Sequence, residues 1–305
     1  MFKGYPVNFP PMATVARGWS AFRIYLEMIK FEHSIFALPF AMIGMMWGSL
    51  AANQTAWPGW EKFFLIVLAM VSCRSAAMAY NRIADRDIDA ENPRTKMRAI
   101  PAGLLTLRQS SIFFFGSCAI FFLAAALLNP LALALSPVAL GTTLFYSISK
   151  RFTPLCHFIL GLSLGIAPAA AYIGVAGRLD WAIVPMTVAV LLWTAGFDLI
   201  YALQDEEFDR KKGLRSMPQT LGKDRALALS RGCHFGAVAF LALAGTFTGV
   251  GIAYYLGVIF AGLLLGYEQS LVKPDDLSRV NLAFFTLNGF VSIGVFVFAL
   301  IDVLV

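Results

Sequence analysis

Nine apolar runs, each close to the length of one membrane crossing, constrain the fold more than any other feature of this sequence. A helix of about 20 residues spans the hydrocarbon core. In lipid, backbone groups must be satisfied within one segment, which favours helices over strands. The composition agrees, because 59% of residues are hydrophobic and 14% are charged, against about 45–50% and about 25% in globular proteins. The sequence therefore predicts an all-α, polytopic membrane protein. Its nine transmembrane helices are expected at roughly 34–52, 62–81, 110–128, 130–148, 153–175, 181–203, 232–249, 251–268 and 283–303.

The basic residues are distributed unevenly between the two sides of these spans. Of 24 Lys and Arg, only Lys62 and Arg178 fall in loops on one side, and Arg74 falls within a span. By the positive-inside rule, this predicts a cytoplasmic N-terminus, an outer C-terminus and a place in a bacterial inner membrane. Because the charges sit in short loops, the net charge of +6 does not indicate nucleic acid. The first thirty residues lack a short apolar core, so no cleavable signal peptide is expected.

The layout of the chain repeats once. In each half, a span leads into an acid-rich segment and a long basic loop, and two closely joined spans follow. Such an echo is typical of internal duplication. We predict a single membrane domain over 1–305, with a first half at 30–150, a second half at 153–268 and an extra helix at 283–303.

The first acid-rich segment places Asn81, Asp85 and Asp89 at intervals of four residues. At about 100° per residue, these three side chains share one face of a helix. Arg74 lies seven residues earlier on the same face, deeper in the membrane. In the second segment, Asp198, Asp205 and Asp209 likewise fall on one face, with Tyr201 beside them.

Carboxylates stacked on one face repel one another unless a cation lies among them. An ionised Asp198 within an apolar run is costly and is usually functional. Oxygen ligands suit Mg²⁺, which is commonly held by one or two carboxylates, waters and substrate phosphates. The predicted metal ligands are Asn81, Asp85, Asp89, Asp198, Asp205 and Asp209. A solvated helix end is the better interpretation of Asp87, Glu91, Glu206 and Glu207, which lie off these faces.

Basic residues follow both segments. Arg94 and Arg98 come after the first segment, and Lys150 ends the fourth span. A diphosphate leaving group gains charge as its C–O bond breaks, and nearby cations stabilise that charge. The positive-inside rule alone explains other basic residues, such as Lys211 and Lys212.

Two further polar residues, Arg74 and His157, each have more than one predicted role. Arg74 and His157 are candidates to bind a carboxylated acceptor. Arg74 could instead pair with Asp198 or Glu32, and His157 could instead be an interfacial packing residue. His33 is a weaker candidate.

These segments resemble the two motifs of the UbiA family of intramembrane prenyltransferases. The family's first motif reads approximately NDxxDxxxD before an Arg-rich run and a Pro-x-Gly turn, which matches 81–89 and 92–103 here. Its second reads DxxYxxxDxxxD with a trailing Gly and Ser, which matches Asp198 to Asp209, then Gly213 and Ser216. Arg82 stands where the family usually has Asp, and 99–103 departs from the common Pro-Leu-Pro-Ser-Gly.

The resemblance implies a central cavity that opens sideways to lipid, and Mg²⁺-dependent transfer of an isoprenoid to a ring carbon. It implies a polyprenyl diphosphate and an aromatic acid as substrates, with Asp85, Asp198, Arg98, Lys150 and Tyr201 in catalysis. The chain looks most like 4-hydroxybenzoate polyprenyltransferases, and it is also similar to a branch that is proposed to prenylate a dihydroxynaphthoate. Prenyl length and oligomeric state are not predicted.

A membrane transporter is the alternative from another class, because it would also have a pseudo-repeat and buried acids. Transporters more often bind their ligand near the midplane on broken helices. Here the acids lie at helix ends beside basic loops, which suits a phosphate headgroup at the surface with its tail in lipid.

Overall fold

The computed structural model describes residues 19–30 and 34–305, and in this part of the chain nine helices are long and apolar enough to cross a membrane. This confirms the predicted all-helical fold. The membrane-length helices are α2 (Ser34–Asn53), α3 (Trp60–Ala84), α5 (Leu107–Leu128), α6 (Pro130–Ser149), α7 (Cys156–Ala176), α8 (Val184–Ala202), α11 (Lys223–Thr248), α12 (Ile252–Leu271) and α13 (Asn288–Leu304). The shorter helices are α1 (Trp19–Met28), α4 (Arg86–Glu91), α9 (Glu206–Lys212) and α10 (Met217–Leu221). Short 3₁₀ turns, η2 (Trp181–Ile183) and η3 (Leu203–Asp205), flank α8, and a π-helical turn, η4 (Leu282–Leu287), leads into α13.

The helix boundaries differ from prediction mainly at α11, which begins at Lys223 rather than near 232. Its first turns carry charged residues, so the apolar run begins later in the sequence than the helix does. The helix continues past the apolar stretch because its backbone hydrogen bonds do not depend on hydropathy.

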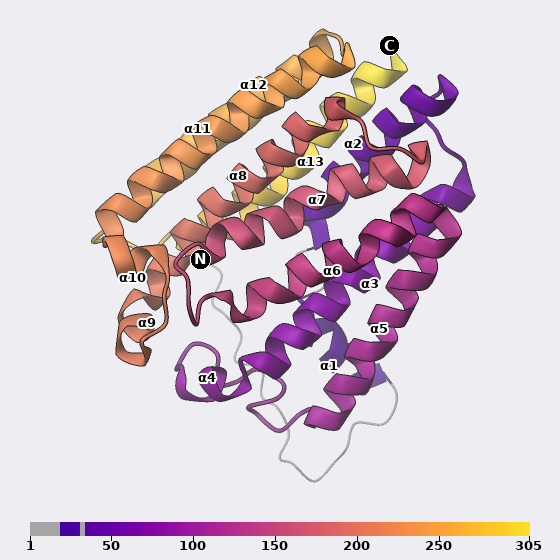
Figure 1. The fold of residues 1–305 in the computed structure, drawn as a ribbon. Coiled ribbons are helices and arrows are strands. Elements are labelled where there is room, and N and C mark those ends of the chain that lie inside the picture. The colour runs from indigo at the N-terminus through magenta and orange to yellow at the C-terminus, as the bar shows by residue number, and fades with distance from the viewer. Residues whose placement is uncertain (1–18, 31–33) are drawn as a thin grey trace.

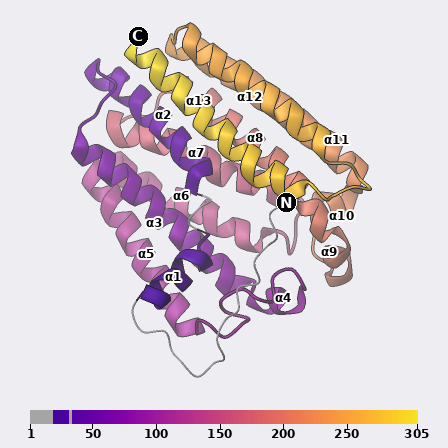
Figure 2. The same cartoon turned by 180° about the vertical axis from the view of Figure 1, so that it is seen from behind.

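Helices α2 and α7 pack against each other between two groups of helices, with α3, α5 and α6 on one side and α8, α11 and α12 on the other (Figure 1). Helix α3 packs against α5 and α6, while α8 packs against α7 and α11. Helices α12 and α13 pair, and α13 returns to α2, as seen from behind (Figure 2). The short helices α4, α9 and α10 gather at one end of the bundle, and the C-terminus lies at the other. The two acid-rich segments therefore lie at the same end.

Glycines allow the closest helix approaches. A Cβ added at Gly44 of α2 would lie 2.0 Å from the carbonyl oxygen of Pro168 in α7. One added at Gly161 of α7 would lie 2.3 Å from the carbonyl oxygen of Leu191 in α8. Small residues at helix contacts are typical of membrane proteins, where packing rather than the hydrophobic effect holds helices together. The Gly161 contact brings α7, with His157 at its start, close to α8, which carries Asp198.

Large apolar side chains cover the outside of the bundle. Phe115 of α5, Phe235 of α11 and Leu263 of α12 are all mostly exposed. Such a surface fits lipid rather than water. The chain is therefore a multi-pass membrane protein. The proposed duplication of its two halves stays a prediction.

Candidate active site

Twelve residues that the sequence predicts in the site line one cavity of about 880 Å³. Its walls come from α1, α2, α3, α5, α6, α7 and α8, from η4, and from the segments that follow α3 and α8. The predicted residues that line it are Arg74, Asn81, Asp85, Asp89, Arg94, Arg98, Lys150, His157, Asp198, Tyr201, Asp205 and Asp209. The two acid-rich segments thus share one chamber, whose remaining lining is largely apolar.

The first acid-rich segment crosses from α3 into α4. Asp85 ends one helix and precedes the next, but the backbone hydrogen bonds to residues four earlier continue through it, from Asp85 to Asn81 and from Asp89 to Asp85. The side-chain amide of Asn81 donates to Asp85 Oδ2 at 3.2 Å. Asp85 and Asp89 are only 2% and 3% exposed. The spacing of four therefore keeps all three on the cavity side despite the helix break.

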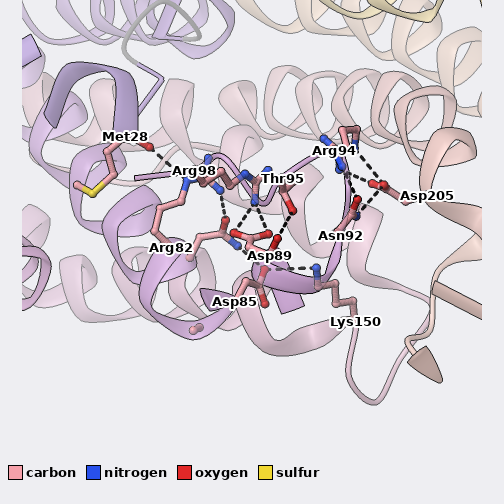
Figure 3. A network of polar contacts seen from close by, with 12 residues as sticks. Met28, Arg82, Asp85, Asp89, Asn92, Arg94, Thr95, Arg98, Lys150 and Asp205 are labelled. Atoms are coloured by element: carbon pink, nitrogen blue, oxygen red, sulfur yellow. Dashed lines mark hydrogen bonds and ion pairs between the residues drawn. The ribbon is translucent and has the colours of Figure 1, made fainter. Parts of the chain in front are cut away.

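Each buried carboxylate of this segment faces a cation (Figure 3). Lys150 Nζ lies 3.3 Å from Asp85 Oδ2. Arg98 Nη1 lies 2.7 and 2.9 Å from the two oxygens of Asp89. Buried carboxylates are stable only when a counter-charge offsets their desolvation. Lys150 and Arg98, which the sequence predicts to bind a diphosphate, therefore pair with Asp85 and Asp89 in this structure.

The second acid-rich segment begins in α8 and passes through η3 into α9. Asp198 and Asp209 are buried. The chain turns back at Gly213, whose φ of 68° lies in the left-handed region that glycine tolerates. Asp198 Oδ2 lies 2.6 Å from His157 Nδ1. That contact with His157 was not anticipated from the sequence.

Arg94 connects the two segments (Figure 3). Its Nε donates to Asp205 Oδ1 at 3.0 Å, and its Nη1 donates to the hydroxyl of Tyr201 at 3.2 Å. The Asn92 amide also donates to Asp205, at 3.3 Å. Burial opposes the charge of Arg94, but its hydrogen bond to Asp205 and the charge of that carboxylate outweigh this and raise the pKa of the guanidinium. Arg94 therefore carries its charge throughout the physiological pH range.

Two aromatic rings that line the cavity, Tyr201 and Phe284, form an aromatic wall beside Arg94. The Arg94 guanidinium lies 5.4 Å from the ring centroid of Tyr201. The Tyr201 ring lies 4.2 Å from that of Phe284 in η4. Aromatic faces attract cations, so this wall suits positive charge.

Arg82 and Asn92 also line the cavity, although they are not predicted as site residues from the sequence. Arg82 is 5% exposed, and its Nη1 donates to Asn81 Oδ1 at 2.9 Å while its Nε donates to the Met28 carbonyl at 3.3 Å. Its only sequence signal was a departure from the family pattern. Asn92 could have been found from its place in an Asn-Pro turn, since Asn side chains favour local hydrogen bonds there.

Arg74 lies deeper in the cavity and donates from Nη2 to the Lys30 carbonyl at 3.0 Å. Its suggested partner Glu32 lies outside the described residues, as does His33. The role of Arg74 therefore stays a prediction.

The donor set fits a hard cation bound together with a phosphate ligand. All six predicted ligands offer oxygen atoms, which Mg²⁺ prefers. Within residues 19–30 and 34–305, no three His, Cys, Asp or Glu side chains form an all-protein metal cage. Mg²⁺ commonly takes one or two carboxylates and completes its shell with water and substrate phosphates, so the arrangement fits a metal that arrives with a diphosphate.

The fold and the site define a multi-pass helical membrane protein with an acid-lined chamber at one end of its bundle. Residues 41–291 match the UbiA prenyltransferase family, and the chain belongs to that family. It is therefore a prenyltransferase, and the transporter alternative has no comparable support.

Relatives and solved structures agree with this assignment. The chain is 32% identical over 248 residues to a 4-hydroxybenzoate octaprenyltransferase of Saccharophagus degradans, covering 81% of this chain and 82% of that protein. It is 28% identical to a protein of the same description from Vibrio campbellii, covering 92% and 97%. The apo structure of a UbiA homolog from Aeropyrum pernix K1 superposes with a TM-score of 0.80 at 36% identity, covering 89% and 98%.

A more distant structure supports the fold alone. The UbiA homolog from Archaeoglobus fulgidus, solved with DMAPP and Mg²⁺ bound, has a TM-score of 0.70 at 19% identity and covers 92% of this chain and 99% of its own.

Proposed function

We propose that this protein transfers a polyprenyl group from its diphosphate to a ring carbon of 4-hydroxybenzoate. The observation that carries the proposal is the junction of two buried acidic segments, linked by Arg94 and Asp205, at the end of one largely apolar cavity. A charged headgroup fits the acidic and basic end, and an isoprenoid tail fits the rest. The relatives described as 4-hydroxybenzoate octaprenyltransferases supply the acceptor.

The residues proposed to hold Mg²⁺ are Asn81, Asp85, Asp89, Asp198, Asp205 and Asp209. When bound, Mg²⁺ would neutralise part of the charge that grows on the diphosphate as its C–O bond breaks.

The basic residues act on the same leaving group. Arg94, Arg98 and Lys150 line the cavity and are held in place by carboxylates. From there their N–H groups can donate to diphosphate oxygens, and such charge-assisted bonds strengthen as charge develops. Their role is to stabilise the departing diphosphate.

The aromatic wall receives the other product of bond cleavage. The allylic cation left on the prenyl carbon would lie against Tyr201 and Phe284, whose faces favour positive charge. The ring carbon ortho to the acceptor hydroxyl then forms the new C–C bond, and the ring loses its proton. Arg74, which lines the cavity, would bind the acceptor carboxylate.

The site lies at the end of the bundle that carries α4, α9 and α10 (Figure 1). Most of the basic residues lie in loops on the side of the spans that the positive-inside rule assigns to the cytoplasm. We therefore place the protein in the bacterial inner membrane, with the N-terminus and the active site toward the cytoplasm.

The acceptor is tested in membranes from cells that express the chain, supplied with polyprenyl diphosphate, Mg²⁺ and labelled 4-hydroxybenzoate or labelled dihydroxynaphthoate. We expect prenylated hydroxybenzoate, formed at least about tenfold faster than the naphthoate product, because a site fitted to one acid leaves groups unpaired with the other. A faster reaction with the naphthoate would overturn the acceptor and keep the reaction. Asp85→Ala membranes are the control for background activity.

A further inference from the structure

We propose that His157 is a positioning residue for this reaction, which holds Asp198 through one ring nitrogen and the first residue of α10 through the other. The inference rests on the proposed function in one respect only, namely that Asp198 contributes to the site for metal and diphosphate. The hydrogen bonds that carry it are independent of the acceptor and of the prenyl chain.

The imidazole lies between two parts of the chain that are far apart in sequence. His157 Nδ1 is 2.6 Å from Asp198 Oδ2 in α8. His157 Nε2 accepts a hydrogen bond from the backbone N–H of Met217, the first residue of α10, at 3.3 Å. The ring is only 3% exposed. Its position is therefore fixed from both ends.

The Met217 contact also sets which nitrogen carries the proton. A backbone N–H can only donate, so Nε2 must present its lone pair and carries no hydrogen. In a neutral imidazole the hydrogen then lies on Nδ1, which donates to Asp198. The geometry thus points to Nδ1 as the ring nitrogen that donates to Asp198.

This arrangement leaves Asp198 one oxygen for the cavity. Oδ2 is held by His157, and no second hydrogen-bond partner of Asp198 is found within the described residues. Asp198 is 9% exposed and lines the cavity. A carboxylate fixed through one oxygen presents the other in a constant direction, as outer partners do for metal ligands in general.

Arg215, two residues before α10, is hydrogen-bonded to the segment that follows α6. The backbone N–H of Arg215 donates to the Lys150 carbonyl at 2.7 Å, and its Nη1 donates to the Phe152 carbonyl at 2.9 Å. Lys150 is also the residue whose side chain pairs with Asp85. His157 therefore connects Asp198 to a segment that is anchored beside the first acidic cluster.

Three substitutions separate this role from simple packing. In His157→Asn the amide nitrogen takes the place of Nδ1, so the bond to Asp198 is kept. In His157→Gln the amide nitrogen takes the place of Nε2, so that bond is lost while a polar group remains. His157→Leu removes both bonds. His234→Leu is the matched control, because His234 is also 3% exposed but bonds to Gln269 of α12, outside the cavity lining.

The readouts are Mn²⁺ bound to purified protein in the presence of inorganic diphosphate, measured by equilibrium dialysis, and the Mg²⁺ concentration for half-maximal rate. We expect His157→Leu to weaken Mn²⁺ binding and to raise the Mg²⁺ requirement by about 10-fold or more, the usual cost of losing an outer partner of a ligand. His157→Asn should recover most of this loss and His157→Gln little of it. His234→Leu should bind Mn²⁺ like wild type, even if its melting temperature falls.

Wild-type Mn²⁺ binding in His157→Leu would overturn the inference, and so would equal losses in the Asn and Gln variants. If the wild-type protein binds Mn²⁺ with the predicted order of variants but forms no prenylated acid, the proposed function fails and the positioning role stands.

Discussion

Arg94 in the segment after α4 and Asp205 at the end of η3 are 111 residues apart in sequence, yet Arg94 Nε lies 3.0 Å from Asp205 Oδ1. This pair joins the two acid-rich segments, and both residues line the cavity. It also places a guanidinium beside the proposed site of the diphosphate.

Replacing Arg94 tests that placement. We expect Arg94→Ala to lower kcat/KM for the polyprenyl diphosphate by about 100-fold, comparable to the loss of one donor to a developing negative charge. Arg94→Lys should recover only part, because an ammonium cannot reproduce the forked contact with Asp205 and Tyr201. Steady-state kinetics on purified protein give the result.

The control for this variant is Arg210→Ala. Arg210 pairs with Glu206 on the exposed side of α9, with its side chain 60% exposed, so its loss should leave kcat/KM nearly unchanged. Equal effects of the two substitutions would show that Arg94 acts only through net charge.

The buried acids should be indispensable for turnover. Asp85→Ala and Asp198→Ala each remove one of the proposed oxygen ligands of Mg²⁺, and we expect the rate to fall by at least about 1000-fold, as when central catalytic groups are lost. Asp87→Ala is the control from the same segment, because its side chain is 83% exposed. Rates are compared after expression is matched by immunoblot. Near-normal turnover in either buried variant would remove that carboxylate from the site.

Most of the fold and the common face of the acidic residues could be predicted from the sequence. The apolar runs predicted nine spans because length and hydropathy are local properties. The spacing of Asp85 and Asp89 predicted their common face because the backbone pattern continues through the break after α3. Both predictions depended on residues near one another in the chain.

The partners of these residues could not be predicted in the same way. The contacts of Arg94 with Asp205 and of His157 with Asp198 depend on how α3, α7 and α8 pack. That packing is set by close helix approaches, such as Gly44 on Pro168, which carry no polar signal. The contacts of Arg82 with Asn81 and the Met28 carbonyl could not be predicted, because the neighbouring sequence does not show where its side chain points. In the sequence, Arg82 differs from the residue usual in the family motif and gives no other signal.

Arg82 is expected to be a required part of this chain rather than a tolerated exception. Arg82→Asp restores the residue usual in the family, but here it would place a third carboxylate near Asp85 and Asp89 and leave the Met28 carbonyl without its donor. We expect a loss of about 1–3 kcal/mol in stability, the cost of one unsatisfied buried group, and lower activity. Thermal unfolding in detergent measures the first effect. A variant as stable and active as wild type would show that the site adapts to either residue.

The glycine contact between α2 and α7 should limit the stability of the bundle. Gly44→Ala would place a Cβ 2.0 Å from the Pro168 carbonyl oxygen, so the two helices must separate, which we expect to cost about 1–3 kcal/mol as overpacking does. Gly116→Ala on α5 is the control, because nothing lies within 4 Å of its Cβ position. Melting temperatures of the two variants in the same detergent are compared. An equal effect of both would mean that helix approach at Gly44 is not restrictive.

The most direct test of the whole account is the product formed by purified protein in lipid vesicles from a labelled polyprenyl diphosphate and either 4-hydroxybenzoate or dihydroxynaphthoate, with Mg²⁺ or with excess EDTA. We predict a ring-prenylated acid that appears with Mg²⁺, disappears with EDTA and is absent in Asp198→Ala. The account is contradicted if wild-type protein with Mg²⁺ gives no prenylated product from either the benzoate or the naphthoate.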